Sequence, residues 1–215
     1  LAGCATPPQE TRSTSPVFYP PPPNAPRIQY LTSFSGAEDI DEKATPFATF
    51  IVGEDESTPR GLMKPYGVAF NAGKLYAVDS RGSGFSIFDF HNRTYRQVNG
   101  EIGQFKPGDV AVIGNKVFVS DLEHHHIKVL DKASGKIAYT FGEAGSNKGQ
   151  LMFPTNLAVD SREHLYVSDT INFRVEIFTA EGLYVGEVGE IGNRPGTFTR
   201  PKGIALDRED RLYVV

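Results

Sequence analysis

Two histidines in one short segment are the residues of this sequence best suited to bind a metal. His124 and His126 are one residue apart, so their imidazoles lie on the same face of an extended strand. Two imidazoles at that spacing can hold a transition metal such as zinc. A third ligand would have to come from Asp121, from Glu123 or from outside this sequence. Because surface histidines are often solvated, we expect no bound cofactor, and zinc or calcium at His124 and His126 is the alternative.

A second set of candidate binding residues occupies positions that change from one copy of an internal repeat to the next. Asp109 and Asn156 stand where Gly67 and Gly203 stand in other copies. A position that accepts glycine needs no side chain for folding, so the polar side chains are available to bind a ligand or to make local turn bonds. With the loop residues expected beside them, the candidate ligand-binding residues are Tyr66, Arg81, Asp109, Glu123, His124, Asn156 and Asn172.

One aspartate recurs in every complete copy of the repeat. Asp79, Asp121 and Asp169 each follow a short apolar run at the same position. A residue that every copy needs usually serves the fold, here by accepting hydrogen bonds from backbone N–H groups in the following turn. We therefore predict a structural role for these three carboxylates. No nucleophile–base pair, phosphate-binding glycine loop or paired-carboxylate spacing is evident elsewhere in the sequence.

The elements that position these residues follow from the repeat itself. Four copies contain Pro65, Pro107, Pro154 and Pro201, which are 42, 47 and 47 residues apart. Each unit reads as four short β-prone segments separated by turns, without an apolar stripe of helical spacing. The second segment is apolar almost throughout and should be buried on both faces, whereas the alternation in the third predicts one face more buried than the other. Four antiparallel strands repeated radially form a β-propeller blade, so we predict an all-β propeller with about four blades in this sequence.

The strand order sorts the connecting loops onto two faces of the propeller. The linkers that end at each repeat proline and the loops after each repeat aspartate are expected on one face, around the mouth of the channel. The remaining turns lie on the other face. Ligands usually bind to the loops at one end of a rigid scaffold. For this reason, the candidate ligand-binding residues are all taken from the first face.

The third copy of the repeat resembles a known family. Its segment Asp169-Thr170-Ile171-Asn172-Phe173-Arg174-Val175-Glu176-Ile177-Phe178 is similar to the NHL-repeat motif. The second copy departs from the motif by placing His124 and His126 where Asn and Arg stand, and the first has glycines there. The resemblance covers residues 59–215 and implies an NHL-type β-propeller, six-bladed in the complete protein. It also carries the alternative function, since some NHL-type enzymes, the peptidyl-amidoglycolate lyases, hold zinc with histidines.

Residues 28–58 extend the pattern toward the N-terminus. We predict that Ile28–Phe34 is the third strand of an earlier blade and that Phe47–Val52 is its fourth. Its inner strands would come from the far end of the chain, because a closed ring leaves no exposed edges. The sequence stops at Val215, just before the next repeat aspartate, so we expect a fragment from which roughly ninety residues of a six-bladed ring are missing.

The first residues resemble the processed end of a bacterial lipoprotein signal peptide. The segment Leu-Ala-Gly-Cys ends at Cys4, the single cysteine of the chain, and in that family the cysteine sulfur takes a diacylglycerol. Eight of the fifteen prolines fall within residues 7–26, a composition that lacks the apolar surface needed to fold. We predict a lipidated tether over residues 1–27 and a propeller over residues 28–215. The residue after the cysteine is not the aspartate used for inner-membrane retention, which favours the outer membrane of a Gram-negative organism.

Composition and charge narrow the function classes. The net charge of −4 and the pI near 5.8 give no global basic field, so we expect no nucleic-acid partner. No apolar run reaches the roughly 18 residues of a membrane-spanning helix, so membrane contact is expected through the lipid alone. We predict an exported, envelope-anchored lipoprotein, more a binding module than an enzyme, whose propeller binds a protein or other macromolecule. The alternative is a metal-dependent lyase or lactonase with its site at the channel mouth.

Overall fold

The computed structural model describes residues 17–21, 23–25, 27–40, 61–81, 84–98 and 105–215. Cys4 and the predicted strand Phe47–Val52 lie outside these residues. The chain divides into two units, Leu1–Phe34 and Ser35–Val215. Among the described residues, no helix has the length and apolar character needed to cross a membrane.

The first unit contains a two-stranded antiparallel hairpin, and this corrects one prediction. Strand β2 (Ile28–Tyr30) pairs with β1 (Val17–Tyr19), with Val17 opposite Tyr30, so it is not the third strand of a blade. The triplet Val17–Tyr19 favours a β-strand and lies between prolines of the predicted tether. Because only a short loop separates it from β2, pairing these two strands costs little loop-closure entropy. The boundary between the units accordingly falls after Phe34.

The second unit contains three four-stranded antiparallel sheets, as the repeat predicts. We call them blades 1, 2 and 3. Blade 1 consists of β3 (Pro65–Asn71), β4 (Lys74–Asp79), β5 (Gly84–Asp89) and β6 (Thr94–Val98). Blade 2 consists of β7 (Pro107–Ile113), β8 (Lys116–Asp121), β9 (His126–Asp131) and β10 (Ile137–Phe141). Blade 3 consists of β13 (Pro154–Val159), β14 (Leu165–Asp169), β15 (Arg174–Phe178) and β16 (Tyr184–Val188).

Four short strands and one helical turn complete the described part of this unit. Strands β17 (Ile204–Leu206) and β18 (Leu212–Val214) pair as the start of a further sheet, at the predicted positions of the fourth copy. Strands β11 (Glu143–Ala144) and β12 (Gln150–Leu151) form a parallel pair in the linker between blades 2 and 3. The 3-10 turn η1 spans Ala37–Asp39.

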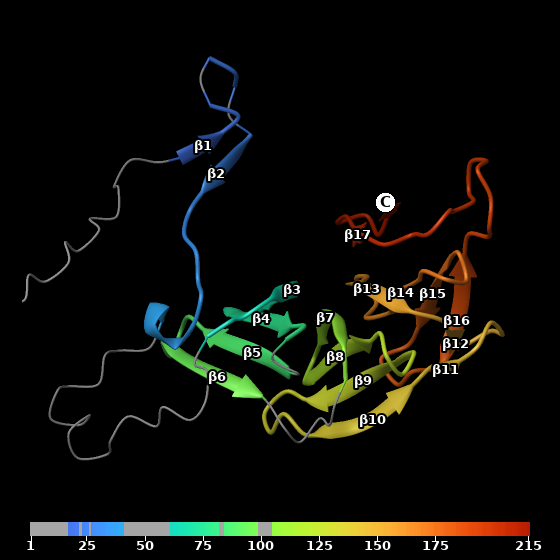
Figure 1. The fold of residues 1–215 in the computed structure, drawn as a ribbon, viewed down its shortest axis with the longest axis horizontal. Coiled ribbons are helices and arrows are strands. Elements are labelled where there is room, and N and C mark those ends of the chain that lie inside the picture. Colours follow the sequence, from blue (N-terminus) through green and yellow to red (C-terminus); the bar gives the residue numbers. More distant parts are fainter. Residues whose placement is uncertain (1–16, 22, 26, 41–60, 82–83, 99–104) are drawn as a thin grey trace, which may run out of the picture. The chain divides into compact units, whose positions relative to one another are not determined.

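The three blades fan out around a common inner side (Figure 1). The first strands, β3, β7 and β13, contact one another in sequence, and β13 also contacts β17. The fourth strands, β6, β10 and β16, lie on the outer side of the fan (Figure 1). An all-β fold with radially repeated antiparallel sheets is a β-propeller, so the predicted fold class is confirmed.

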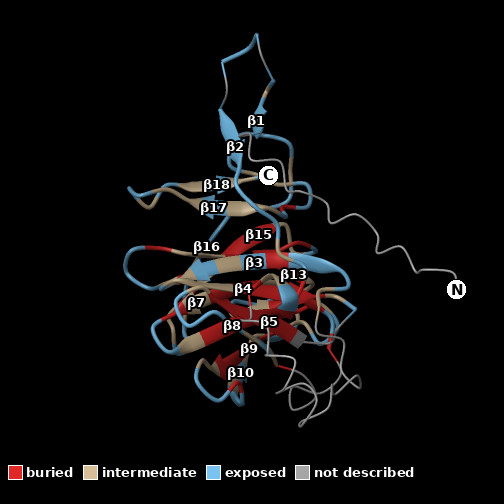
Figure 2. Cartoon of the chain, turned by 90° about the vertical axis from the view of Figure 1, so that its left-hand side faces the viewer, coloured by how far each residue is buried: buried red, intermediate tan, exposed pale blue. Residues whose placement is uncertain are grey.

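Burial concentrates in the middle strands of each blade (Figure 2). In β8, Val117, Phe118 and Val119 are all completely buried, which confirms that the second strand is covered on both faces. One apolar cluster lies between blades 1 and 2 and another between blades 2 and 3. Each blade is therefore stabilised mainly by burial against its neighbours, at about 25 cal/mol per Å² of apolar surface.

The first strand of every complete blade contains a β-bulge. The pairing register shifts between Pro65 and Val68 in blade 1, and in blades 2 and 3 it shifts at the corresponding positions. The bulges fall on Gly67, Asp109 and Asn156, the variable positions of the repeat. A β-bulge interrupts the alternation of side chains between the two faces of a strand. Residues at these three positions therefore point in a different direction from the one that a regular strand would give.

Candidate functional site

One face of the propeller unit, which we call the loop face, gathers the linkers that end at the repeat prolines and the loops that follow the second strands. Backbone hydrogen bonds tie each loop to its linker, which confirms the predicted sorting of these loops. They run from the N–H groups of Ser80, Leu122 and Ile171 to the carbonyl oxygens of Lys64, Lys106 and Met152, at 3.1, 2.9 and 3.1 Å.

The three repeat aspartates have the structural role that the sequence predicts. Asp79 accepts a hydrogen bond from the backbone N–H of Arg81 in the following loop, at 2.8 Å. Its carboxylate also accepts one from the N–H of Lys64, at 3.0 Å, so it joins the loop to the linker. Asp121 and Asp169 are completely buried; Asp121 accepts a hydrogen bond from the N–H of Glu123 in its loop, at 3.0 Å, and Asp169 accepts one from the N–H of Met152 in its linker, at 2.6 Å. All three carboxylates therefore bond backbone groups of the fold.

Asp109 and Asn156 meet across the boundary between blades 2 and 3. Asp109 Oδ2 accepts hydrogen bonds from the backbone N–H of Leu157, at 3.0 Å, and from Asn156 Nδ2, at 3.4 Å. Burial raises the pKa of Asp109, although these bonds oppose the rise. A Cβ added at Gly67 would lie 2.2 Å from Asp109 Oδ1, so glycine at that position makes room for the carboxylate. Of the two roles left open for Asp109 and Asn156, the structure displays the hydrogen-bonding one: Asp109 accepts a local bond from the N–H of Val110, at 2.9 Å, and the bonds from Leu157 and Asn156 join two blades.

Blade 2 carries a polar cluster around Asp121. Its Oδ2 atom lies 2.8 Å from His124 Nδ1, 3.5 Å from His126 Nε2 and 3.2 Å from Lys128 Nζ. The two imidazole rings stack with centroids 5.6 Å apart. Burial alone would raise the pKa of Asp121, but hydrogen bonds from His124 and Lys128 hold it below its ordinary value. Burial lowers the pKa of His126 and so favours the neutral ring.

The cluster can do two kinds of chemistry. An ionised Asp121 only accepts hydrogen bonds, so His124 must donate from Nδ1, and its Nε2 is left to accept a proton or a hydrogen bond. The His124 side chain is 48% exposed, which makes that atom accessible from solvent. One ligand atom from each of Asp121, His124 and His126 lies within 4.8 Å of the others, as a metal site requires. Lys128 opposes a cation there, because its ammonium group already lies beside the carboxylate.

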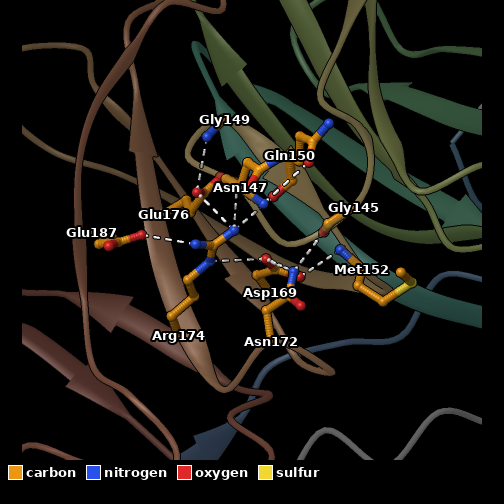
Figure 3. Close-up of polar contacts among 10 residues, drawn as sticks. All are labelled: Gly145, Asn147, Gly149, Gln150, Met152, Asp169, Asn172, Arg174, Glu176 and Glu187. Carbon is orange, nitrogen blue, oxygen red and sulfur yellow. Dashed lines mark hydrogen bonds and ion pairs between the residues drawn. The ribbon is translucent and has the colours of Figure 1, made fainter.

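Blade 3 carries a second polar cluster, built around an arginine (Figure 3). Arg174 donates to Asp169 and Glu187, at 3.1 and 2.9 Å, and lies 3.0 Å from Glu176 Oε1. It also donates to the carbonyl oxygens of Asn147 and Gln150, at 2.9 Å each.

Two further residues of this cluster, Glu176 and Asn172, also form hydrogen bonds within the fold. Glu176 is completely buried, and burial raises its pKa to about 7. Its Oε1 accepts a hydrogen bond from the backbone N–H of Gly149, at 3.0 Å. The amide nitrogen of Asn172 donates to Asp169 and to the Gly145 carbonyl oxygen, at 2.6 and 2.8 Å. The amide of Asn172 thus bonds within the fold.

The remaining candidates lie on the loop face without being drawn into one cluster. Tyr66, Arg81 and Glu123 are exposed, and the backbone N–H of Glu123 donates to Asp121 at 3.0 Å. The structure therefore brings together Asp109 with Asn156, and His124 with His126. It places Asn172 in the separate cluster of blade 3.

The sequence pattern does not predict the buried polar position on the third strand of each blade. Ser86, Lys128 and Glu176 occupy it and are 1%, 6% and 0% exposed, although the alternation predicted a less buried face there. These side chains are buried because the neighbouring linker and blade cover this face of the strand as well. An alignment of the three copies does single out this position. It is Ser, Lys and Glu in turn, and burial alone would not favour three polar residues.

No family model matches the chain. Among solved structures, it is similar to the Staphylococcus aureus virginiamycin B lyase variant H270A crystallised with quinupristin, at 16% identity and a TM-score of 0.56. That alignment covers 70% of this chain and 48% of the lyase. It is also similar to Kuenenia stuttgartiensis hydrazine synthase, at 12% identity and a TM-score of 0.57, over 75% of this chain and 44% of that one. These likenesses show the propeller fold.

A curated protein matches by sequence over a shorter stretch. The Drosophila melanogaster protein named brain tumor is 32% identical over 87 residues, which are 39% of this chain and 8% of that protein. The chain therefore spans a small part of this relative and less than half of the aligned solved structures.

Proposed function

We propose that the chain is an NHL-type binding propeller of the bacterial cell envelope, anchored by a lipid on Cys4, whose loop face binds a protein partner. The observation that carries the proposal is the charge of that face. Within the described loops it exposes seven Lys or Arg residues and three Glu residues. The basic ones are Lys64, Arg81, Lys106, Lys148, Arg194, Arg200 and Lys202, and the acidic ones are Glu123, Glu143 and Glu190.

A basic face on a chain of net charge −4 favours a partner with an acidic surface. Apolar side chains stand among the charges on the same loops. Met63, Tyr66, Ile171 and Ile191 are 58%, 61%, 43% and 68% exposed. Aromatic residues and methionine are enriched in protein interfaces, and a charged surround steers the encounter.

The binding proposal is tested by charge reversal on both faces of the propeller. The chain is incubated with a solubilised envelope extract, and retained proteins are compared among wild type, an Arg81→Glu/Lys106→Glu variant and an Arg162→Glu/Arg208→Glu variant. Arg162 and Arg208 are exposed on the opposite face, so they match the change in charge. We expect one protein to be retained by wild type and by the opposite-face variant and lost from the loop-face variant. Equal retention by all three, or retention of nucleic acid in place of protein, contradicts the proposal.

The anchor is tested separately. We expect the Cys4→Ser protein, expressed with its native export signal, to leave the membrane fraction for the soluble fraction. If that variant still fractionates with membranes, the lipid anchor is wrong.

A second candidate function, a metal-dependent lyase or lactonase, is favoured by the Asp121–His124–His126 arrangement. Zinc titration monitored by calorimetry tests it, with His126→Ala as the variant. Stoichiometric zinc binding that this variant loses would support the enzyme, and absence of binding would remove it. Neither result depends on the loop-face charges.

A further inference from the structure

A pocket opens on the opposite face of the propeller, away from the candidate site. It has a volume of about 320 Å³ and lies between blade 1 and the β9–β10 turn of blade 2. We call it the Tyr76 pocket. Its lining residues are Lys74, Tyr76, Ile87, Asp89, Thr94, Arg96, Lys132 and Ala133.

Two cross-strand rows of blade 1 form the floor of the Tyr76 pocket. Tyr76, Ile87 and Arg96 are paired across β4, β5 and β6, and Lys74, Asp89 and Thr94 form the next row toward the strand ends. Side chains two residues apart on a strand share one face, so both rows point the same way. Lys132 and Ala133 cover them from blade 2.

The pocket is positively charged. Lys74 Nζ lies 2.6 Å from Asp89 Oδ2 and neutralises that carboxylate. Arg96 donates to the carbonyl oxygens of Ala133 and Lys132, at 2.9 and 3.1 Å, which fixes its guanidinium without neutralising it. Lys132 donates to the amide oxygen of Asn71, at 2.8 Å. Three cations therefore face one carboxylate, for a net charge of about +2 at neutral pH.

One residue that lines this positive pocket carries a buried hydroxyl group without a partner in the described part of the chain. Tyr76 is completely buried, and among the described residues its hydroxyl has no hydrogen-bond partner. An unsatisfied buried polar atom destabilises the folded state, so its retention calls for an explanation. Burial raises the pKa of Tyr76, so the hydroxyl keeps its proton and is available as a donor.

The next inter-blade boundary demonstrates that the fold does not need this arrangement. Between blades 2 and 3, Phe118, Tyr139 and Ala180 occupy the positions of Tyr76, Arg96 and Lys132. Tyr139 and Lys116 both donate to the Ala180 carbonyl oxygen, so the docking contact is kept. Phe118 and Phe141 fill the space with rings whose centroids are 6.5 Å apart. The boundary between blades 2 and 3 closes with apolar rings, whereas the one between blades 1 and 2 leaves a cationic pocket and a hydroxyl without a partner among the described residues. The second arrangement therefore has a role beyond folding.

We propose that the Tyr76 pocket binds the phosphate group of a small phosphorylated molecule. Lys132 and Arg96 supply the positive charge, and the Tyr76 hydroxyl donates a hydrogen bond to a phosphate oxygen. A phosphate monoester carries about −1.5 to −2 charges at neutral pH, which matches the pocket better than a single carboxylate does. The proposal is independent of the loop-face partner.

Isothermal titration calorimetry of the 215-residue chain with inorganic phosphate tests the proposal, with acetate at equal ionic strength as the comparison. We expect saturable phosphate binding and at least tenfold weaker acetate binding. Tyr76→Phe should weaken phosphate binding about tenfold, and Lys132→Ala roughly fivefold. Both variants copy the residue found at the same position of the next boundary. Lys116→Ala, which changes the lysine of that next boundary, should leave phosphate affinity unchanged.

The Tyr76→Phe variant separates binding from folding. Removing an unsatisfied buried hydroxyl does not lower stability, so its thermal midpoint should equal or exceed that of wild type. Three results would overturn the proposal: no saturable phosphate binding, phosphate binding that survives both Tyr76→Phe and Lys132→Ala, or acetate binding as tight as phosphate binding.

Discussion

Blades 2 and 3 place different polar groups on the same backbone positions. His126 and Arg174 occupy one position, and the oppositely charged Lys128 and Glu176 occupy another, two residues along the third strand. The preceding loop has the same shape in both blades, since His125 and its counterpart Phe173 both have a positive φ, 58° and 60°. The blade architecture therefore fixes where buried polar groups stand, while their charge is set locally.

The difference between the two clusters separates scaffold from site. In blade 3, one guanidinium group contacts three carboxylates and two backbone carbonyl groups, and the network joins the linker to the blade. In blade 2, one carboxylate contacts two imidazoles and an ammonium group, and one of the imidazoles stays half exposed. We infer that the blade 3 cluster stabilises the propeller and that the blade 2 cluster remains accessible to a ligand.

The largest expected effect is the loss of Arg174. Arg174→Met leaves the carboxylates of Asp169 and Glu176 buried without their cation, so the free energy of unfolding should fall by about 3 to 5 kcal/mol. His126→Met changes the same position in blade 2 and should cost less than about 1 kcal/mol. Urea unfolding followed by circular dichroism measures both. Equal losses would break the distinction between the clusters.

The second effect is the pH dependence that Glu176 in blade 3 contributes to stability. The pKa of Glu176 is about 7 in the folded chain and 4.5 ordinarily, so between these values the folded state binds more protons than the unfolded state. The contribution of this residue to stability is therefore lost as pH rises through that window, by up to about 3 kcal/mol.

Glu176→Gln should remove this slope and should stabilise the chain at pH 8 relative to wild type. Glu187→Gln is the matched control, because Glu187 is 33% exposed and contacts the same arginine. The measurement is the urea midpoint of all three proteins at several pH values. A slope that persists in Glu176→Gln would assign it to another group.

A smaller effect is expected where the two blades meet. Asp109→Ala leaves the N–H group of Leu157 without its acceptor, so we expect a loss of about 1 to 2 kcal/mol in the free energy of unfolding. The loss should add to that of Arg174→Met, because the two sites share no contact. Strong non-additivity would mean that the clusters of blades 2 and 3 are energetically coupled.

The smallest effect concerns metal affinity in blade 2. If Lys128 opposes a cation beside Asp121, Lys128→Met should bind zinc about tenfold more tightly than wild type. The same change should not alter phosphate binding on the opposite face. Zinc affinity that falls in Lys128→Met would show that the ammonium group does not oppose the metal.

The sequence predicts the blades well and the buried charges poorly. The recurrence of proline and aspartate sets the strands, because both residues have local roles: Asp79 bonds the turn that follows it. Arg174 lies only two residues before Glu176, but the other groups around this carboxyl are not local. Gly149, whose N–H group donates to it, lies 27 residues earlier, and Glu187, which is opposite it in the sheet, lies on another strand. Pairings of that kind depend on how the blade folds, so no periodicity reveals them.

For the N-terminal strand, the sequence pattern fails for the opposite reason, because the pairing that forms is local. Ile28–Phe34 has a pattern that fits a blade strand, yet Ile28 pairs with Tyr19 in a local hairpin. Two short β-prone segments close together in sequence can satisfy each other at a low entropic cost, which a repeat alignment does not weigh. The inter-blade role of Asp109 was also out of reach, because it depends on which blades are adjacent.

The most direct test of the central claim is site-specific photocrosslinking of the envelope-anchored protein in cells. A photoreactive phenylalanine analogue replaces Glu123 in the blade 2 loop or, as the matched position on the opposite face, Arg162; both side chains are exposed. The account predicts a discrete protein crosslink from position 123 and none from position 162. A crosslink from position 162 alone, or from neither position, would contradict binding at the loop face.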